Sequence, residues 1–478
     1  MTHPHPTPAA APHTAAPPPT GPRPWLALAL LCVAQFMLVL DVTVVNVALP
    51  SIAADLNLGR TALTWVVTTY TLCFGGLMLL GGRLADVLGT RRTLLAGLAL
   101  FTVASLMTGL ASDAATLLAG RTAQGVGAAL LSPSALAIVT TSFHGRDRHR
   151  ALGVWAAIGG AGAAIGVLLG GILTDGPGWE WIFYVNVPIG TALLLALPAV
   201  VPARAPRPAR LDIPGALLVT AGTGSLIYGL VAAGDSGWSG PRTLVSVAAA
   251  VVAYGAFAAV ERAQRAPLID LAVLRRRPVV VGAYLMLVAT ALLISLFFLG
   301  SVFLQEVRGY SALRTGVLFL PVAVATGVGA HIGGHFVGRV GARPTAGVGL
   351  ALAGLGTGLL TGAGPDGSAW ATVVPGMSVA ALGLGSVFVA ATTTALGYIA
   401  PEEAGVASGV VNTFHEVGGS IGVAVVSTVA ASGIEGGTSG GFTDAFLVCA
   451  VAAVVSAAAT FALVPRGKPR LSGGPHVH

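Results

Sequence analysis

Fourteen apolar runs follow one another along this chain, each about 20 residues long, which is the length an α-helix needs to cross the hydrocarbon core of a membrane. Helices suit that solvent because they satisfy their own backbone hydrogen bonds. The composition agrees, since 55% of the 478 residues are hydrophobic and only 9% are charged, whereas roughly a quarter are charged in soluble domains. We therefore predict an all-α membrane protein with fourteen transmembrane helices, at residues 25–49, 63–82, 93–111, 115–141, 151–173, 182–201, 213–233, 243–260, 279–304, 314–337, 344–363, 370–398, 405–430 and 442–464.

The positive charges alternate with these runs. Of the 25 Lys and Arg residues, twenty fall in tails and loops on one side of the predicted membrane, four fall on the other side, and Arg121 falls inside a run. Lys and Arg are enriched in cytoplasmic loops. Only one of the 25 is a lysine, a bias typical of GC-rich bacterial genomes. We therefore predict a multi-pass protein of the bacterial plasma (inner) membrane with both termini in the cytoplasm.

A sequence pattern occurs twice, eight runs apart. The segment 82–91 follows the second run and the segment 334–343 follows the tenth, and both have Gly, Gly and Arg at identical offsets. The tripeptide Ile-Gly-Val also recurs at 165–167 and 421–423, in the fifth and thirteenth runs. Parallel repeats around a site at the membrane midplane are a transporter architecture, so the pattern predicts two six-helix bundles with two helices inserted between them.

The domain boundaries follow from this repeat and from composition. The first residues are rich in Pro, Ala, Thr and His, which predicts a disordered cytoplasmic tail rather than a signal peptide. We expect a tail at 1–24, an N-terminal bundle at 25–201, the two inserted helices with flanking loops at 202–278, a C-terminal bundle at 279–464 and a second tail at 465–478.

Several function classes lack support in the sequence. There is no Walker-type phosphate loop and no HExxH, and the three cysteines lie inside apolar runs without metal-ligand spacing. No constellation of nucleophile and base or of metal ligands falls at one depth, which argues against a membrane-embedded enzyme, and the repeat contains no pore loop. The net charge of +7 comes from short arginine clusters between runs rather than from one basic face, so we expect no nucleic-acid partner. We predict no metal, no cofactor and no enzymatic activity.

Four segments carry recognisable motifs. They are Leu40 to Pro50 (LDVTVVNVALP) in the first run, Gly82 to Arg92 after the second, Arg121 to Gly127 (RTAQGVG) in the fourth, and Gly178 to Gly190 (GWEWIFYVNVPIG) entering the sixth. Together with the fourteen runs, these segments resemble the major facilitator superfamily, and specifically its fourteen-spanner drug:proton antiporter branch. The resemblance implies a proton-coupled secondary active transporter that exports hydrophobic or cationic small molecules, such as drugs or antibiotics, by alternating access. It also implies a small-molecule substrate, protons and the lipid bilayer as partners, and we expect a monomer.

The chain departs from that branch at three sites. One is Glu180, which stands where the branch usually has arginine between the two tryptophans. The fifth-span motif of the branch usually has proline after the glycine, and this chain has Val167 after Gly166. Because that proline is associated with exporters, a proton-coupled uptake transporter of the same fold stays open, as does an exporter dedicated to one endogenous metabolite. In the thirteenth run, His415 and Glu416 stand where the family often has Arg-Gln.

Three unambiguously charged side chains lie within the runs, namely Asp41, Arg121 and Glu416. A charge in a membrane span needs a partner, a polar cavity or a proton. We predict that Asp41 and Glu416 are proton or cation sites and that Arg121 sets the charge state near Asp41. The alternative is that they form structural ion pairs. His331, one helical turn before His335, is a further candidate for proton coupling.

The resemblance assigns roles to three more sets of residues. Asp86 would form a latch between the two halves and so stabilise one conformation. The alternative is that the arginines of this loop only follow the positive-inside rule and that the loop has no gating role. The predicted gating motif comprises Gly82, Asp86, Gly89, Arg91 and Arg92. The predicted substrate cavity comprises Asn46, Tyr70, Gln124, Trp155 and His415, and the antiporter-motif helix carries Gly162, Gly166 and Gly170.

Overall fold

The computed structural model describes residues 24–143, 145–202, 212–264, 276–397, 404–436 and 438–465, so both predicted tails lie outside it except for residues 24 and 465. The elements are α1 (Pro24–Asp55), α2 (Arg60–Leu88), α3 (Thr90–Gly109), α4 (Ala114–Ser142), α5 (Gly145–Asp175), α6 (Trp181–Tyr184), α7 (Asn186–Val200), α8 (Ile213–Ser236), α9 (Pro241–Ala263), α11 (Arg277–Val302), the short π-helix η1 (Phe303–Val307), α12 (Ala312–Val340), α13 (Ala342–Leu360), α14 (Ala369–Leu396), α15 (Ala404–Val429), α16 (Ala431–Gly436) and α17 (Ser439–Leu463).

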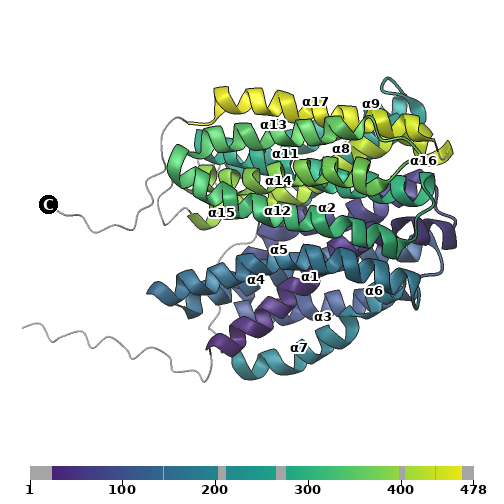
Figure 1. Ribbon diagram of the computed structural model, residues 1–478. Helices are drawn as coiled ribbons and strands as arrows, with labels where there is room; N and C mark the ends of the chain where they lie inside the picture. The colour runs from purple at the N-terminus through teal and green to yellow at the C-terminus, as the bar shows by residue number, and fades with distance from the viewer. Residues whose placement is uncertain are drawn as a thin grey trace, which may run out of the picture.

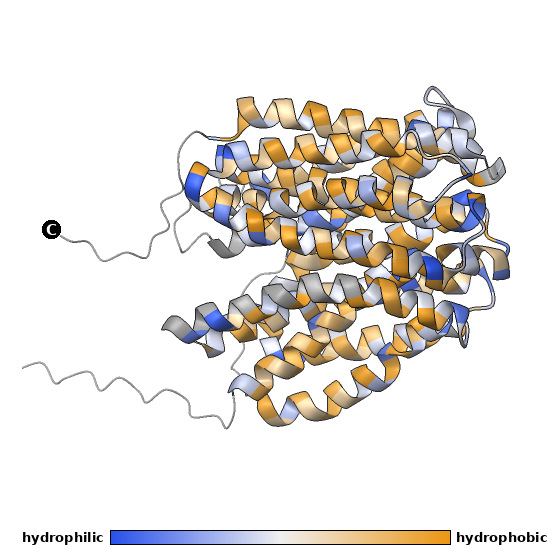
Figure 2. Cartoon of the chain, in the orientation of Figure 1, coloured by the Kyte–Doolittle hydropathy of each residue, from blue (hydrophilic) through white to orange (hydrophobic). Residues whose placement is uncertain are grey.

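Every predicted run coincides with helix, the sixth being shared by α6 and α7. Within the described residues, eleven spans are long and apolar enough to cross a membrane, and Figure 2 shows how hydrophobic residues cover them. Two tight junctions are genuine breaks. Asp113 caps the start of α4, where its carboxylate accepts a hydrogen bond from the N–H of Thr116 (2.9 Å). Eight residues separate α13 from α14, and among them Gly367 has a φ of +89°. The fold is all-α, as predicted.

The internal repeat is present in the backbone. Gly89 between α2 and α3 and Gly341 between α12 and α13 both have φ of +93°, a conformation that favours glycine. Four residues later, the hydroxyls of Thr93 and Thr345 donate to the carbonyls of these same glycines (3.3 and 2.8 Å). The turn between α2 and α3 and the turn between α12 and α13 are therefore equivalent, as the two matching segments predict.

The two halves meet along two pairs of helices. The helix α2 packs on α15, and α5 packs on α12. Of the two inserted helices, α8 lies against both α2 and α15, whereas α9 packs on α8. The first residue of α1 and the last of α17 lie at the same end of the bundle (Figure 1), which we call the termini end, and the opposite end is the far end.

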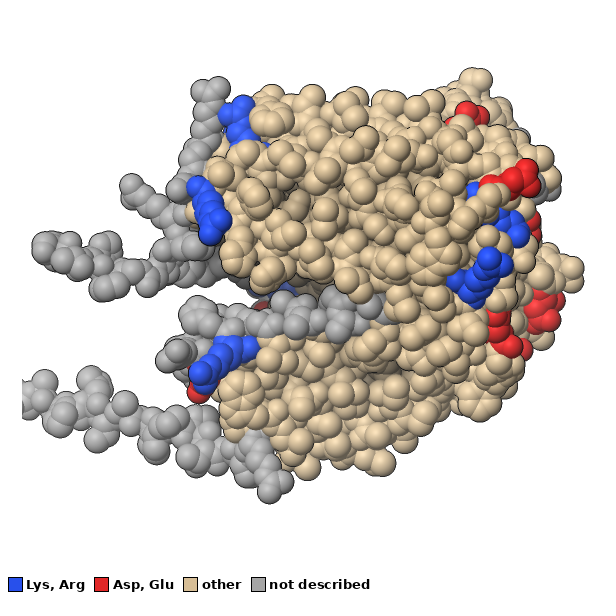
Figure 3. Space-filling view, viewed as in Figure 1, with Lys and Arg blue, Asp and Glu red and all other residues tan. Residues whose placement is uncertain are grey.

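Contacts between the halves close the far end. The carboxylate of Asp175, at the end of α5, accepts hydrogen bonds from the backbone at the start of α12. The side chain of Gln305 donates to the carbonyl of Val47 on α1 (2.8 Å). At the termini end, Figure 3 shows a notch between two lobes, with acidic residues gathered mainly at the far end and a belt free of charge between. The structure is therefore closed at the far end and open towards the termini end.

Candidate functional site

An ion pair joins Asp41 on α1 to Arg121 on α4. Arg121 Nη1 lies 2.5 Å from Asp41 Oδ2, and each residue is only 1% exposed. Removing two charges from water is costly, and their attraction compensates only where the geometry is good and the remaining hydrogen-bonding atoms are satisfied. From the sequence, Arg121 is expected to lie near Asp41, and the structure brings the two side chains into contact.

Both partners have further hydrogen bonds. Asp41 Oδ1 accepts from the amide of Gln124 (3.0 Å) and from the amide of Asn186 on α7 (3.3 Å). Arg121 also donates from Nε to the carbonyl of Val66 and from Nη1 to Gln124 Oε1, each at 3.0 Å. Asp41 therefore accepts three hydrogen bonds and Arg121 donates three, and α1, α2, α4 and α7 meet at this network.

Two residues predicted to line the substrate cavity belong to this network in the observed conformation. Gln124 and Tyr70 are both 0% exposed, so neither faces open space. The guanidinium of Arg121 lies 4.4 Å from the centroid of the Tyr70 ring, a cation–π contact. The Tyr70 hydroxyl is buried and has no hydrogen-bond partner among the described residues. An arginine at this depth needs acceptors and aromatic faces, and these two side chains supply them.

The glycines of the fifth-span motif set the position of α1 beside this network. A Cβ added at Gly162 would lie 2.9 Å from the Val39 side chain, and one at Gly166 would overlap the Thr43 hydroxyl. A Cβ at Gly170 would lie 3.0 Å from the Val44 carbonyl oxygen. These contacts fall on both sides of Asp41, and small residues allow such close helix approach in membranes. The predicted antiporter-motif helix therefore packs directly on the helix that carries the acid.

The acid of the second half has a different environment. The side chains of Glu416 and His415 on α15 are 14% and 41% exposed, and 4.0 Å separates His415 Nε2 from Glu416 Oε1. His415 Nδ1 shares a hydrogen bond with Thr290 on α11 (2.9 Å), and its ring lies 5.6 Å from that of Phe388. Within the described residues Glu416 has no hydrogen bond, so in contrast to Asp41 it is free to accept a proton or a cation.

The remaining cavity and coupling candidates lie apart from the Asp41 network. His331 and His335 on α12 are exposed, with ring centroids 4.9 Å apart. Trp155 on α5 is half-buried against the core of the first half. The Asn46 amide donates to the Val42 carbonyl of its own helix (2.8 Å), and its buried Oδ1 has no partner among the described residues.

The predicted gating motif lies at the termini end. Asp86, near the end of α2, is exposed and forms no hydrogen bond or ion pair with the described part of the chain. Gly89 makes the turn into α3, whose first residues include Arg91 and Arg92. A Cβ added at Gly82 would lie 3.9 Å from the side chain of Pro133 on α4. Among the described residues, Asp86 therefore has no latch partner in this conformation.

Sequence reasoning missed two residues of the network. Asn186 is 0% exposed and reaches Asp41, and Ser105 on α3 is 0% exposed and accepts from the amide of Gln124 (2.8 Å). Asn186 stands inside a quoted motif, so its amide in an apolar run was a usable signal. Ser105 offered none, because serine is common in membrane helices. Among the described residues no three His, Cys, Asp or Glu side chains gather as a metal site.

Two bundles related by a repeat, with a shielded charge pair in the first and an accessible acid in the second, define a membrane transporter. The family model of the Major Facilitator Superfamily matches residues 31–423, and the chain belongs to this family.

Curated relatives cover most of the chain. The puromycin resistance protein of Streptomyces alboniger is 41% identical over 416 residues, covering 85% of this chain and 82% of its own. The cephamycin export protein of Amycolatopsis lactamdurans is 40% identical over 437 residues, covering 89% of each chain. The tetracenomycin C resistance and export protein of Streptomyces glaucescens is 35% identical over 419 residues, covering 86% of this chain and 76% of its own.

Solved structures agree on the fold. An autoinhibited peptide transporter of the POT family has a TM-score of 0.65 at 16% identity, covering 94% of this chain and 99% of its own. A bacterial homologue of the human lysosomal transporter Spinster has a TM-score of 0.64 at 16% identity, covering 92% of this chain and 96% of its own. At that identity the likeness speaks for the fold alone.

Proposed function

We propose that this protein exports antibiotic-type small molecules from the cytoplasm in exchange for protons. The relatives at 35–41% identity are named for resistance to, or export of, puromycin, cephamycin and tetracenomycin C, and this chain covers more than three quarters of each of them. The three named compounds are different antibiotics, which supports an antibiotic-type substrate for this chain as well.

The buried contact between Asp41 and Arg121 is the single observation that carries the proton coupling. Protonation of Asp41 would cancel the charge that Arg121 now faces at 2.5 Å. The guanidinium would then be a buried cation without a counter-ion, a state that costs several kcal/mol. The helices α1 and α4 would therefore have to move, or a solute would have to supply the missing charge. Either response links proton binding to a change in the first half.

Glu416 is the proposed coupling group of the second half. It is 14% exposed beside His415, and a cationic substrate entering from the termini end would meet its carboxylate without first breaking an ion pair. Competition between proton and cation for one carboxylate is sufficient to couple their movements, because occupation by one lowers the affinity for the other. His331, exposed on α12, is a weaker candidate for proton transfer into this space.

The conformational cycle would rock the bundle of residues 25–201 against that of residues 279–464. The far end is held shut by the contacts of Asp175 and Gln305 with the opposite half. Outward opening would break these contacts and bring α2 closer to the second half at the termini end. Asp86, exposed in the present state, would then engage as the latch.

The orientation proposed for this cycle puts both termini in the cytoplasm, following the arginine distribution. Cysteine tags at Asp366, in the far-end loop before α14, should react with an impermeant maleimide added to intact cells. Tags at Arg276, at the termini end before α11, should react only after permeabilisation. Reaction at Arg276 in intact cells would reverse the orientation and with it the direction of export.

Transport by reconstituted protein tests the function itself. Proteoliposomes with an imposed pH gradient would be supplied with puromycin, a cephamycin and a tetracycline-like polyketide, with a protonophore as the control. The proposal expects at least one compound to move against its gradient, opposite to the proton flow, and to stop when the protonophore is added. Movement in the direction of the proton flow would instead assign the chain to the uptake alternative that Val167 leaves open.

A further inference from the structure

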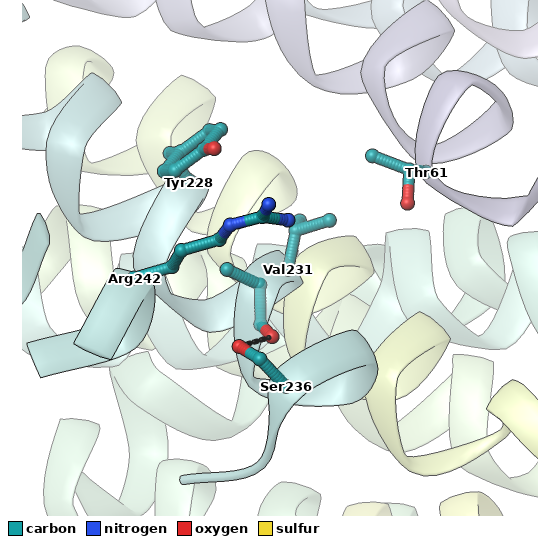
Figure 4. A pocket seen from close by; sticks show the side chains of 6 residues that line it. Thr61, Tyr228, Val231, Ser236 and Arg242 are labelled. Carbon is teal, nitrogen blue, oxygen red and sulfur yellow. Dashed lines mark hydrogen bonds between the residues drawn. The ribbon is translucent and has the colours of Figure 1, made fainter. Parts of the chain in front are cut away.

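A small cavity at the far end is separate from the Asp41 network. Its volume is about 150 Å³, and it is lined by Thr61 at the start of α2, by Tyr228, Val231, Ala232 and Ser236 on α8, and by Arg242 at the start of α9. Figure 4 shows the guanidinium of Arg242 directed into the space between Tyr228 and Thr61. Drug-sized ligands occupy pockets of about 300–1,000 Å³, and a cavity of this size suits a small polar group instead.

Arg242 differs from the other arginines of the far end. Arg308 donates to the carbonyl of Gly364 (2.6 and 3.1 Å), and Arg314 lies 3.6 Å from the centroid of the Tyr310 ring. Arg60 is buried and has an interaction partner. The side chain of Arg242 makes no hydrogen bond, ion pair or ring contact with a described residue. Arg242 is exposed where it lines the cavity. A guanidinium presents its donors as a planar fork that fits two oxygens of a phosphate, so Arg242 is available to an anionic oxygen ligand there.

The surroundings of the cavity are those of the membrane interface. Trp238, in the turn between α8 and α9, is 61% exposed, as is typical of aromatic residues at the level of lipid headgroups. Leu244 and Val245, in the first turns of α9, are 56% and 68% exposed, which makes them available to acyl chains. In addition, α9 begins at Pro241 without a side-chain cap, so the partial positive charge of its N-terminus adds to that of Arg242.

We propose that this cavity binds the phosphate group of a membrane phospholipid, with Arg242 as the ion-pair partner, the Ser236 and Tyr228 hydroxyls beside the headgroup, and the acyl chains along the apolar face of α9. The cavity joins α2 of the first half to α8, whose Leu230 carbonyl accepts a hydrogen bond from the Thr428 hydroxyl of α15 (2.7 Å). A bound headgroup would therefore bridge the inserted helices and the moving N-terminal half. The shared chemistry is a phosphate oxyanion, and inorganic phosphate is the other possible source.

Native mass spectrometry of the full chain tests the proposal. Purified, delipidated protein would be titrated with phosphatidylglycerol, with diacylglycerol, which has the same acyl chains without phosphate, and with inorganic phosphate. The matched variants are Arg242→Gln, Arg242→Lys and Arg314→Gln, the last of which removes the same charge from the same end. Thermal unfolding in detergent without lipid checks that each variant folds.

The proposal expects wild type to retain phosphatidylglycerol in preference to diacylglycerol, and expects Arg242→Gln to lower that affinity about tenfold, the value of one charge-assisted hydrogen bond. Arg242→Lys should lie between, and Arg314→Gln should match wild type. Retention of inorganic phosphate that is lost in Arg242→Gln, without preference for the phospholipid, would keep the oxyanion site and replace the lipid by a free anion. Equal phosphatidylglycerol affinity in wild type and Arg242→Gln would overturn the proposal.

Discussion

The carboxylate of Asp175 caps the helix that starts beside Leu313 in the opposite half of the molecule, accepting hydrogen bonds from the N–H groups of Leu313 (2.9 Å) and of its neighbour Ala312 (3.1 Å). Asp175 ends α5, where the helix dipole does not favour an acid, and it sits at the start of α12, where the dipole does. The cap therefore stabilises the conformation that is closed at the far end, and it has to break when that end opens.

We expect Asp175→Ala to shift the protein towards the state that is open at the far end. Loss of a helix cap costs about 1 kcal/mol, which corresponds to about a fivefold change in the ratio of the two conformations. Spin labels at Leu110 and Trp370, which are exposed on opposite halves, would report a larger share of long distances by pulsed electron resonance. Asp366→Ala is the control, because it removes the same charge from the same end without uncapping a helix. An unchanged distance distribution in Asp175→Ala would show that the cap does not hold the far end shut.

The Asp41–Arg121 pair makes a prediction about stability. Asp41→Asn leaves Arg121 as a buried cation without its counter-ion, and removal of one partner of such a pair costs about 3–5 kcal/mol. The double variant Asp41→Asn with Arg121→Gln removes that cation as well, so it should unfold at a higher temperature than Asp41→Asn alone. Thermal unfolding of wild type, both single variants and the double variant completes the cycle. If the double variant is as unstable as the sum of the single variants, the two residues do not stabilise each other.

Much of this architecture was predictable from the sequence, because lipid restricts the choice. A run long enough to span must be a helix, and for that reason the predicted runs all coincide with helices. The repeat was predictable because Gly89 and Gly341 need the same positive φ to make the same turn. The contact between Asp41 and Arg121 was predictable only as a similarity of depth, since depth along a helix does not say which face of it meets which neighbour.

The remainder of the site depends on rotation and packing that a single sequence does not encode locally. Tyr70 and Gln124 were predicted to line a cavity, but both are closed around Arg121. Whether such a side chain faces ligand or counter-ion is decided by the conformation that the chain adopts, and alternating access uses at least two. The latch proposed for Asp86 would likewise form in only one of these conformations.

The fifth-span glycines make a prediction about packing. Gly166→Ala should separate α5 from α1, because its Cβ would overlap the Thr43 hydroxyl and lie 2.9 Å from the Thr43 Cβ. Overpacking of this kind typically costs about 1–3 kcal/mol, and here it also displaces Asp41, so both the melting temperature and transport should fall. Gly358→Ala on α13 is the matched control, since an added Cβ there has no neighbour within 4 Å. Transport by Gly166→Ala at the rate of Gly358→Ala would refute the packing role.

The accessible acid of the second half makes a prediction about pH dependence. Glu416→Gln keeps the size of the side chain and removes its proton-binding group, so we expect the dependence of transport on pH to flatten and the affinity for cationic substrates to fall more than that for neutral ones. Transport by Glu416→Gln would be measured over a pH series for one cationic and one neutral compound, with Glu306→Gln, an acid of η1 at the far end, as the control. A wild-type profile in Glu416→Gln would reduce Glu416 to a structural residue.

Proton release on substrate binding tests the central claim most directly. Purified wild-type protein in weakly buffered detergent solution would be mixed with the antibiotic that proteoliposomes transport fastest, and the pH change would be recorded with an indicator dye, alongside Asp41→Asn and the control Asp366→Asn. Substrate affinity would be measured in parallel, so that release is expressed per bound molecule. The account predicts equal release by wild type and by Asp366→Asn and a smaller release by Asp41→Asn, in which only Glu416 still exchanges its proton. Release by Asp41→Asn equal to that of wild type would contradict the assignment of Asp41 as the proton site.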